Sequence, residues 1–309
     1  MTNYIAYDAT QMGTQTAAAL LRDRTTAKLV NMVEAAKKAD VYSTIGKVVL
    51  RKLTTTSHPE LKRYFLRHKD TMLNRSVWKR PTMTVLYGAT VTTFRVQLSE
   101  DLTEITGERP CNKTASELAT VTYAALKEVL PAPIALMGSL TGIVKAAVTA
   151  TNLPFSFTTA TNTTFEAAKY KEVGVRNPGA VFGFSKTSRI TYIGDTIAPG
   201  PTAKSVAAQF IQSFDAVISK QIQRGCVDGG IPVLSVFDSW SVPAEHSAQL
   251  LEIARDAYIN NLSFNYLQRF YDEALATYPF LSDEPELFLE LGDYDISKEL
   301  VAANMFIGL

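Results

Sequence analysis

Cysteine and histidine are both scarce in this chain. Its 309 residues include two cysteines, Cys111 and Cys226, and three histidines. The cysteines stand far apart without a CxxC spacing, so the sequence predicts neither a disulfide framework nor a zinc site, and a reducing compartment is the simpler expectation. The histidines, His58, His68 and His246, are equally dispersed. This spacing argues against a histidine-ligated metal and against a serine–histidine triad.

An excess of charge of one sign is also absent. The formal net charge is +1, with 31 basic and 30 acidic residues, so the overall charge does not indicate nucleic acid. The charges are unevenly distributed along the chain, however. Residues 62–80 are rich in lysine, arginine and histidine and contain one acid, Asp70, whereas residues 283–299 are acidic. The basic interval suits either a phosphate-binding surface or an ordinary solvated face, and the acidic interval does not suit a phosphate backbone.

Long hydrophobic runs are missing too. The longest, residues 133–144, is interrupted by glycines, ends at Lys145 and is too short to span a bilayer. No basic region followed by an apolar stretch opens the sequence, so no secretory signal is visible. We therefore expect a cytoplasmic protein without a membrane partner, with enough residues for one large domain or two.

The most informative stretch that is present is residues 75–88, RSVWKRPTMTVLYG. Basic residues precede an apolar run that stops at Gly88, as a helix does when its final position is left-handed. In a helix, Lys79, Met83 and Tyr87 would share one face. That face suits a polyanion at one end and a flat apolar group at the other, although an amphipathic helix with solvated basic residues and a buried Tyr87 has the same spacing.

Proline and periodicity predict the remaining elements. Because proline is comfortable only in the first helical turn, Pro81 predicts that the regular helix begins near Trp78, with Arg75 just outside it. Further helices are expected over residues 14–22, 39–53, 59–69, 116–130, 205–224, 244–260 and 263–276. Short strands are expected at residues 4–7 and at 181–184 and 189–193, the last two forming a hairpin, and residues 151–164 are expected to form a loop or short strands. The strand at residues 4–7 has nothing before it to pair with, so we expect another part of a complex to supply its neighbour.

Two aspartates each follow a predicted apolar strand. Asp8 follows the strand at residues 4–7, and Asp238 lies at the far end of residues 231–239. If these strands are neighbours, both carboxylates emerge at one sheet edge and can share hard cations, with the Ala9 carbonyl as a further ligand. Such a pair of divalent ions serves in-line displacement at phosphorus, although an aspartate after a strand is also a common turn or cap residue. Together with the basic helix start and its terminal aromatic residue, the aspartates form a consistent nucleotidyl-transfer site.

These motifs resemble those of the single-subunit RNA polymerases of bacteriophages and mitochondria. Residues 8–15, DATQMGTQ, with residues 21–23 behind them, resemble the family's first catalytic motif. Residues 75–88 are similar to its fingers-helix motif, and residues 237–239, FDS, are similar to its second aspartate motif. Order and rough spacing agree, a smaller match falls at residues 40–42, and the resemblance covers essentially the whole chain.

The resemblance implies an α+β fold in which a right-hand polymerase palm, a small antiparallel sheet with helices, carries a mostly helical fingers insertion. Residues 1–24 would form the first part of the palm and residues 25–212 the fingers. Residues 213–309 would complete the palm and end in the family's apolar foot. A hairpin near residues 180–194 resembles the loop that reads promoter DNA.

The resemblance also assigns roles at the reacting phosphate. Asp8 and Asp238, with the carbonyl of Ala9, would hold two magnesium ions. Lys79 would contact the incoming triphosphate and protonate the departing pyrophosphate, and Arg75 would bind the same phosphates.

Further roles concern the nucleoside. Met83 would line the substrate site, Tyr87 would lie under the nascent base pair and help select ribose, and Gly88 would lie against the template. Two positions depart from the family, because Phe237 and Gln212 stand where histidines are usual. Neither change removes a metal ligand, but both affect contacts to the primer end.

Family members carry an N-terminal region and a thumb before the first motif, whereas this sequence opens with Met1 close to Asp8. The two-polypeptide polymerases of some podoviruses are the most similar case. The resemblance thus implies the catalytic subunit of a heterodimeric DNA-directed RNA polymerase, acting in the cytoplasm of an infected bacterium. Its partners would be a second subunit, DNA template, RNA transcript and nucleoside triphosphates. A family A-like DNA polymerase core and a non-catalytic nucleic-acid-binding or scaffold subunit remain alternatives.

Overall fold

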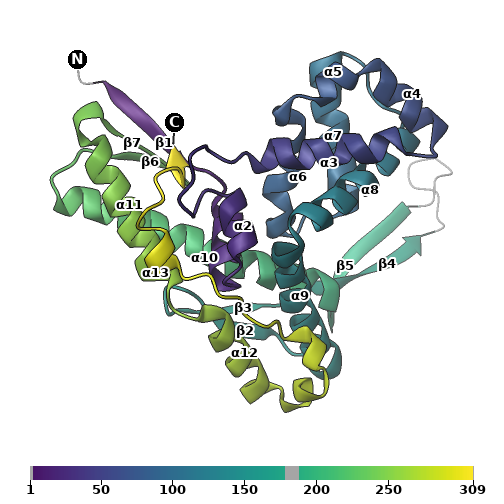
Figure 1. Cartoon of the computed structure of the whole chain (residues 1–309). Coiled ribbons are helices and arrows are strands. Elements are labelled where there is room, and N and C mark those ends of the chain that lie inside the picture. The colour runs from purple at the N-terminus through teal and green to yellow at the C-terminus, as the bar shows by residue number, and fades with distance from the viewer. Residues whose placement is uncertain (1–2, 178–187, 309) are drawn as a thin grey trace.

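A four-stranded antiparallel sheet brings the two ends of the chain together (Figure 1). The computed structural model describes residues 3–177 and 188–308. In the order β6-β7-β1-β8, the strands are β6 (Leu234–Val236), β7 (Ser239–Pro243), β1 (Tyr4–Ala9) and β8 (Ile307–Gly308). With two smaller hairpins among the described residues and a majority of helix, the fold class is α+β, as expected.

Strand β1 lies inside this sheet. Its residue Tyr4 is opposite Pro243 of β7, and its residue Asp8 is opposite both Ser239 of β7 and Gly308 of β8. The expectation that another molecule must supply a neighbour for this strand was therefore wrong. The missing neighbours come from the same chain, more than 230 positions later, where local sequence reasoning cannot see them.

Helices dominate the first half of the chain. They are α1 (Met12–Leu20), α2 (Arg24–Leu29), α3 (Val41–Thr54), α4 (Pro59–Arg67), α5 (Lys69–Met72), α6 (Arg75–Thr84), α7 (Val91–Thr106), α8 (Asn112–Val129) and α9 (Pro131–Thr151). The carboxylates of Asp23 and Asp40 accept hydrogen bonds from the first-turn N–H groups of α2 and α3. Pro59 and Pro131 lie in the first turns of α4 and α9. Proline costs no intrahelical hydrogen bond there, because first-turn N–H groups have no acceptor within the helix.

Four of these helices were not predicted, namely the short α2 and α5 and the longer α7 and α9. Helix α7 opens with Val91, Thr92 and Thr93, whose β-branched side chains disfavour helix in isolation. Helix α9 buries residues at intervals of three and four, but its other face carries small and apolar residues with Lys145 as its one charge, so the amphipathic contrast is weak. By length and composition, α9 is also the described helix that could cross a membrane. Its buried leucines pack against the neighbouring helix α10, so core packing accounts for its apolar character.

Two β-hairpins precede the second half of the chain. One joins β2 (Phe155–Thr158) to β3 (Thr164–Ala167), and the other joins β4 (Tyr170–Asn177) to β5 (Ser188–Ile197). The strand predicted at residues 189–193 lies within β5. The strand predicted at residues 181–184, and with it the tip of the promoter-type hairpin, lies outside the described residues.

The second half is built around one long helix, α10 (Pro199–Asp228). The proline-rich segment at residues 198–201 forms its start. After the sheet strands follow α11 (Ser247–Leu262), α12 (Tyr266–Thr277), α13 (Ile296–Glu299) and the 3₁₀ turns η2 (Ala244–His246), η3 (Pro279–Asp283) and η4 (Pro285–Leu287).

Aromatic residues connect α10 to its neighbours. The Phe210 ring lies 5.7 Å from that of Phe157 in β2 and 5.2 Å from that of Phe270 in α12, both in edge-to-face geometry. Phe214, one turn further along α10, continues the cluster. This packing holds α10 against β2 and α12.

Candidate functional site

Asp8 and Asp238 lie at the same end of the sheet. Asp8 is in β1, directly opposite Ser239, the first residue of β7. The backbone N–H of Ala9 donates a hydrogen bond to the carbonyl oxygen of Asp238 at 3.0 Å. The predicted adjacency of the two segments is therefore confirmed, and a backbone bond fixes it.

The route by which the chain delivers Asp238 differs from the prediction. Residues 231–239 were expected to form one apolar strand, but β6 spans three residues and its side chains are exposed. Phe237 adopts a left-handed conformation with φ of 55° and turns the chain back on itself. Asp238 thus lies in a hairpin turn between β6 and β7, next to β1, instead of ending a buried strand.

The two carboxylates affect each other's ionisation. Burial raises the pKa of Asp8, although one side of this residue is open to a cavity, and the negative charge of Asp238 raises that pKa further. The positive charges of Lys79 and Lys38 act in the opposite direction. The backbone holds the negative charges of Asp8 and Asp238 close together. A cation that binds between the two carboxylates is therefore stabilised by both.

The donor atoms at this edge are all oxygen. Within residues 3–177 and 188–308, no three histidine, cysteine or acidic side chains come together in a way that could hold a metal. Asp8, Asp238 and the Ala9 carbonyl are nevertheless suited to magnesium, which keeps several waters and commonly takes one or two carboxylates together with substrate phosphates. The residues present fit such an ion.

Helix α6 provides the facing wall of the cavity. The side chain of Asn74 accepts a hydrogen bond from the Ser76 N–H at 3.0 Å, so the helix begins at Arg75. The predicted start near Trp78 was wrong, and Pro81 lies inside the helix instead of in its first turn. Tertiary packing outweighs the proline here, because Trp78 is fully buried and donates from Nε1 to the Met72 carbonyl at 2.9 Å.

The end of this helix follows the prediction. The 3₁₀ turn η1 (Val85–Tyr87) continues α6 and stops at Gly88, which is left-handed with φ of 82°. Lys79, Met83 and Tyr87 line one cavity of about 450 Å³ together with Asp8 and Asp238. The prediction that Lys79, Met83 and Tyr87 face the same way is therefore confirmed.

Arg75 is held at the rim of the same cavity. Its Nε lies 3.1 Å from a carboxylate oxygen of Asp40, and its guanidinium stacks over the ring of Tyr42 at 4.9 Å from the centroid. Burial alone would raise the pKa of Asp40, but hydrogen bonds from Ser43 and the charge of Arg75 outweigh it and the pKa is lowered. Asp40 therefore caps α3 and orients Arg75 at the same time.

Tyr87 is fixed by contacts that the sequence did not reveal. Its hydroxyl donates to Oδ2 of Asp215 in α10 at 2.9 Å. A Cβ on Gly13 would lie 3.0 Å from the same hydroxyl oxygen, so a larger residue at this position would crowd the ring. Gln11 joins the two walls of the cavity, because its Nε2 donates to the Thr82 carbonyl at 2.8 Å.

Sequence reasoning therefore missed four residues around the cavity. Gln11 and Gly13 belong to the DATQMGTQ stretch, which pointed to them without giving either a role. Lys38 and Asp215 carried no signal, because neither stands in a recognisable pattern. Lys38 lies close to Gly308, whose Cβ position would be 2.8 Å from the lysine Nζ.

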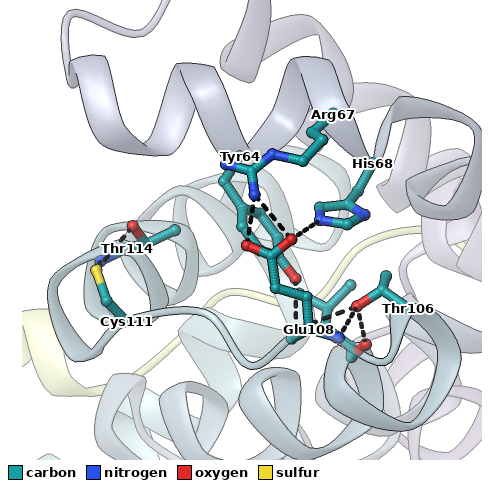
Figure 2. Close-up of polar contacts among 8 residues, drawn as sticks. Tyr64, Arg67, His68, Thr106, Glu108, Cys111 and Thr114 are labelled. Carbon is teal, nitrogen blue, oxygen red and sulfur yellow. Dashed lines mark hydrogen bonds and ion pairs between the residues drawn. The ribbon is translucent and has the colours of Figure 1, made fainter.

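A separate polar cluster joins α4 to the loop before α8 (Figure 2). Glu108 accepts hydrogen bonds from Arg67 at 2.7 and 2.8 Å and lies 3.0 Å from His68, whose hydrogen bond is the main reason that the pKa of Glu108 is lowered. Nearby, Cys111 caps α8 by accepting from the Thr114 N–H at 3.5 Å. None of these residues lines the cavity, so their role is to hold helices together.

The model of the DNA-dependent RNA polymerase family matches residues 2–288. This chain belongs to that family. Its relatives include an RNA polymerase of Pseudomonas phage phiKMV, 27% identical over 82% of this chain, and chloroplastic RNA polymerase 3 of Nicotiana sylvestris, 26% identical over 98%. An Arabidopsis thaliana RNA polymerase of chloroplasts and mitochondria is also 26% identical.

The predicted resemblance to phage and organellar RNA polymerases is thereby confirmed. The chain spans 32% of the length of the phage relative and 31% of the Nicotiana relative. The match to the RNA polymerase family includes β1, β6, β7, α6 and η1, the part of the chain that carries Asp8, Asp238, Lys79 and Tyr87, and does not reach β8.

Proposed function

We propose that this chain performs nucleotide addition in a DNA-directed RNA polymerase, joining nucleoside triphosphates to the 3′ end of RNA on a DNA template. The observation that carries the proposal is the cavity that Asp8 and Asp238 share with Lys79, Met83 and Tyr87. Paired carboxylates facing a cation and an aromatic ring match the needs of phosphoryl transfer to a nucleotide.

Each residue then has a task at the phosphates. Asp8 and Asp238, with the Ala9 carbonyl, would hold two magnesium ions, which would supply activation of the attacking oxygen and charge neutralisation of the departing one. Lys79 binds the triphosphate and gives a proton to pyrophosphate as it leaves. Arg75, kept in place by its ion pair, binds the same phosphates.

The residues further along the same face of the helix contact the nucleoside part of the substrate. Met83 contacts the base pair, Tyr87 lies under it and favours ribose, and Gly88 leaves space for the template. Residues 1–24 and 213–309 form the palm, residues 25–212 the fingers, and the hairpin near residues 180–194 reads promoter DNA. A second polypeptide supplies thumb and N-terminal region, and the complex acts in the cytoplasm of an infected bacterium.

Exchange of the paired carboxylates tests the proposal. We expect Asp8→Asn or Asp238→Asn to reduce ribonucleotide incorporation on a primed template by about a thousandfold, since each variant lacks one of the two shared charges. Template binding, measured by fluorescence anisotropy, should stay within about twofold. Asp228→Asn is the matched control, because Asp228 is exposed and pairs with Arg224 on the surface.

Three other outcomes would redirect the assignment. Unchanged elongation in both variants would refute the metal assignment, and template binding without elongation in the native complex would favour a scaffold role. Preference for deoxyribonucleotides would favour a DNA polymerase. Purification of the complex from infected cells tests for the second polypeptide, which should appear in stoichiometric amount.

A further inference from the structure

We propose that Asp215 is a positioning residue for sugar selection, acting through the hydroxyl of Tyr87. This inference rests on the proposed function, because it concerns how the same site distinguishes ribose from deoxyribose. It assigns a task to α10, a helix that contributes no residue to the phosphate-binding roles above.

The first support is geometric. Tyr87 lines the cavity of about 450 Å³ and also a second cavity of about 760 Å³, whose lining includes Asp215, Gln212 and Phe237. The Tyr87 hydroxyl donates to Asp215 Oδ2 at 2.9 Å across the boundary between the two. Gly13 also lies close to the Tyr87 ring, because a Cβ at this position would be 3.0 Å from the hydroxyl oxygen.

The second support is energetic. A partly buried carboxylate normally has several partners, but Asp215 Oδ1 is sealed from solvent without a hydrogen bond from any residue in the described ranges. Asp215 caps no helix, and among the described residues it forms no ion pair. Burial raises the pKa of Asp215 to about 7, because the ionised carboxylate loses solvation in this environment. Fold stability therefore does not explain this aspartate.

The consequence concerns the direction of the hydrogen bond. With its hydrogen directed to Asp215, the Tyr87 oxygen can only accept from a third group. A ribose hydroxyl can donate to that oxygen, whereas a deoxyribose has no hydroxyl to offer at that position. Asp215 thus fixes the Tyr87 oxygen as a hydrogen-bond acceptor, which allows the site to distinguish ribose from deoxyribose.

The decisive measurement is the ratio of kcat/KM for a ribonucleotide to that for its 2′-deoxy analogue, in the native complex on a primed template. We expect Tyr87→Phe and Asp215→Leu each to lower this ratio about tenfold, the effect of one lost hydrogen bond of about 1.4 kcal/mol. The double variant should be no worse than either single variant, because both changes break one contact.

Two controls separate positioning from structure. Asp215→Asn should retain most of the selectivity, because its amide oxygen still accepts from Tyr87. Gln209→Leu places the same apolar side chain at an exposed position of α10 and should leave the ratio unchanged. A wild-type ratio in Asp215→Leu, or losses that multiply in the double variant, would overturn the proposal while leaving the polymerase assignment intact.

Thermal unfolding gives a readout that does not depend on turnover. Asp215→Leu should leave Tm unchanged or raised, since an apolar side chain replaces a poorly partnered buried acid. Tyr87→Phe should lower Tm in the wild-type background and have no effect in the Asp215→Leu background. An equal loss in both backgrounds, or a clearly lower Tm in Asp215→Leu, would show that Asp215 has an ordinary structural role. Failure of all incorporation with this coupling intact would instead count against the proposed function.

Discussion

At the scale of single residues, Gly13 shows how the position of Tyr87 depends on the absence of a side chain at a neighbouring residue. It is the second residue of α1, and it lies close to the ring of Tyr87, whose hydroxyl donates to Asp215. An ideal Cβ there would be 3.0 Å from the tyrosine oxygen and 3.2 Å from Cζ, closer than most real contacts. The first aspartate motif therefore sets the position of the aromatic residue as well as that of a carboxylate.

We predict that Gly13→Ala lowers ribonucleotide kcat/KM about tenfold, because the added methyl displaces the Tyr87 ring by a few tenths of an ångström. Steady-state incorporation on a primed template measures the effect. Gly138→Ala in α9 is the matched control, since nothing lies within 4 Å of its Cβ position and alanine favours helix. Equal activity in both variants would show that Tyr87 tolerates displacement.

At the scale of elements, connections between helices matter more than the helices alone. The Glu108 cluster joins α4 to the segment that leads into α8, and α8 in turn packs on α3, the helix that Asp40 caps. Figure 2 shows Arg67 and His68 reaching the same carboxylate from one helix. The shell of helices around α6 thus depends partly on an ionised glutamate.

This contact predicts a pH dependence of stability. The lowered pKa of Glu108 means that its carboxylate contributes stability above the ordinary glutamate pKa of 4.5, and this contribution disappears as pH falls through the lowered value. The Tm of Glu108→Gln should therefore lie below that of wild type at pH 7 and converge with it toward pH 3. Glu34→Gln, at an exposed position, is the control. A constant Tm difference across this range would contradict the prediction.

At the scale of the whole molecule, the individual helices and strands were easier to predict from sequence than the contacts between distant parts of the chain. Most helices and the approach of Asp8 to Asp238 were predictable, because periodicity, capping residues and turn residues are local. The position of β8 beside Asp8, the hairpin that carries Asp238 and the partner of Tyr87 were not predictable. Each depends on residues far apart in the chain, such as Asp215 and Tyr87, which no local pattern relates.

We predict that the fold is independent of divalent ions although incorporation requires them. Removal of metal by EDTA should abolish ribonucleotide addition and leave the circular dichroism spectrum and Tm almost unchanged, because the two carboxylates sit in a backbone-paired sheet. Added Mg²⁺ should restore the activity. Ca²⁺ is the control ion, since its larger radius and flexible coordination suit transfer poorly. Unfolding by EDTA would contradict this separation of fold and activity.

The bond from Gln11 to the Thr82 carbonyl has a mechanical consequence. It fastens α6, near the C-terminal end of the helix, to the segment between β1 and α1. Arg75 lies seven residues from Thr82, about 10 Å along the axis at 1.5 Å per residue. If α6 tilted by about 10° about this bond, Arg75 would move by about 2 Å and Thr82 would barely move. The ion pair of Arg75 with Asp40 opposes such a movement, so the two contacts together fix the tilt of the helix.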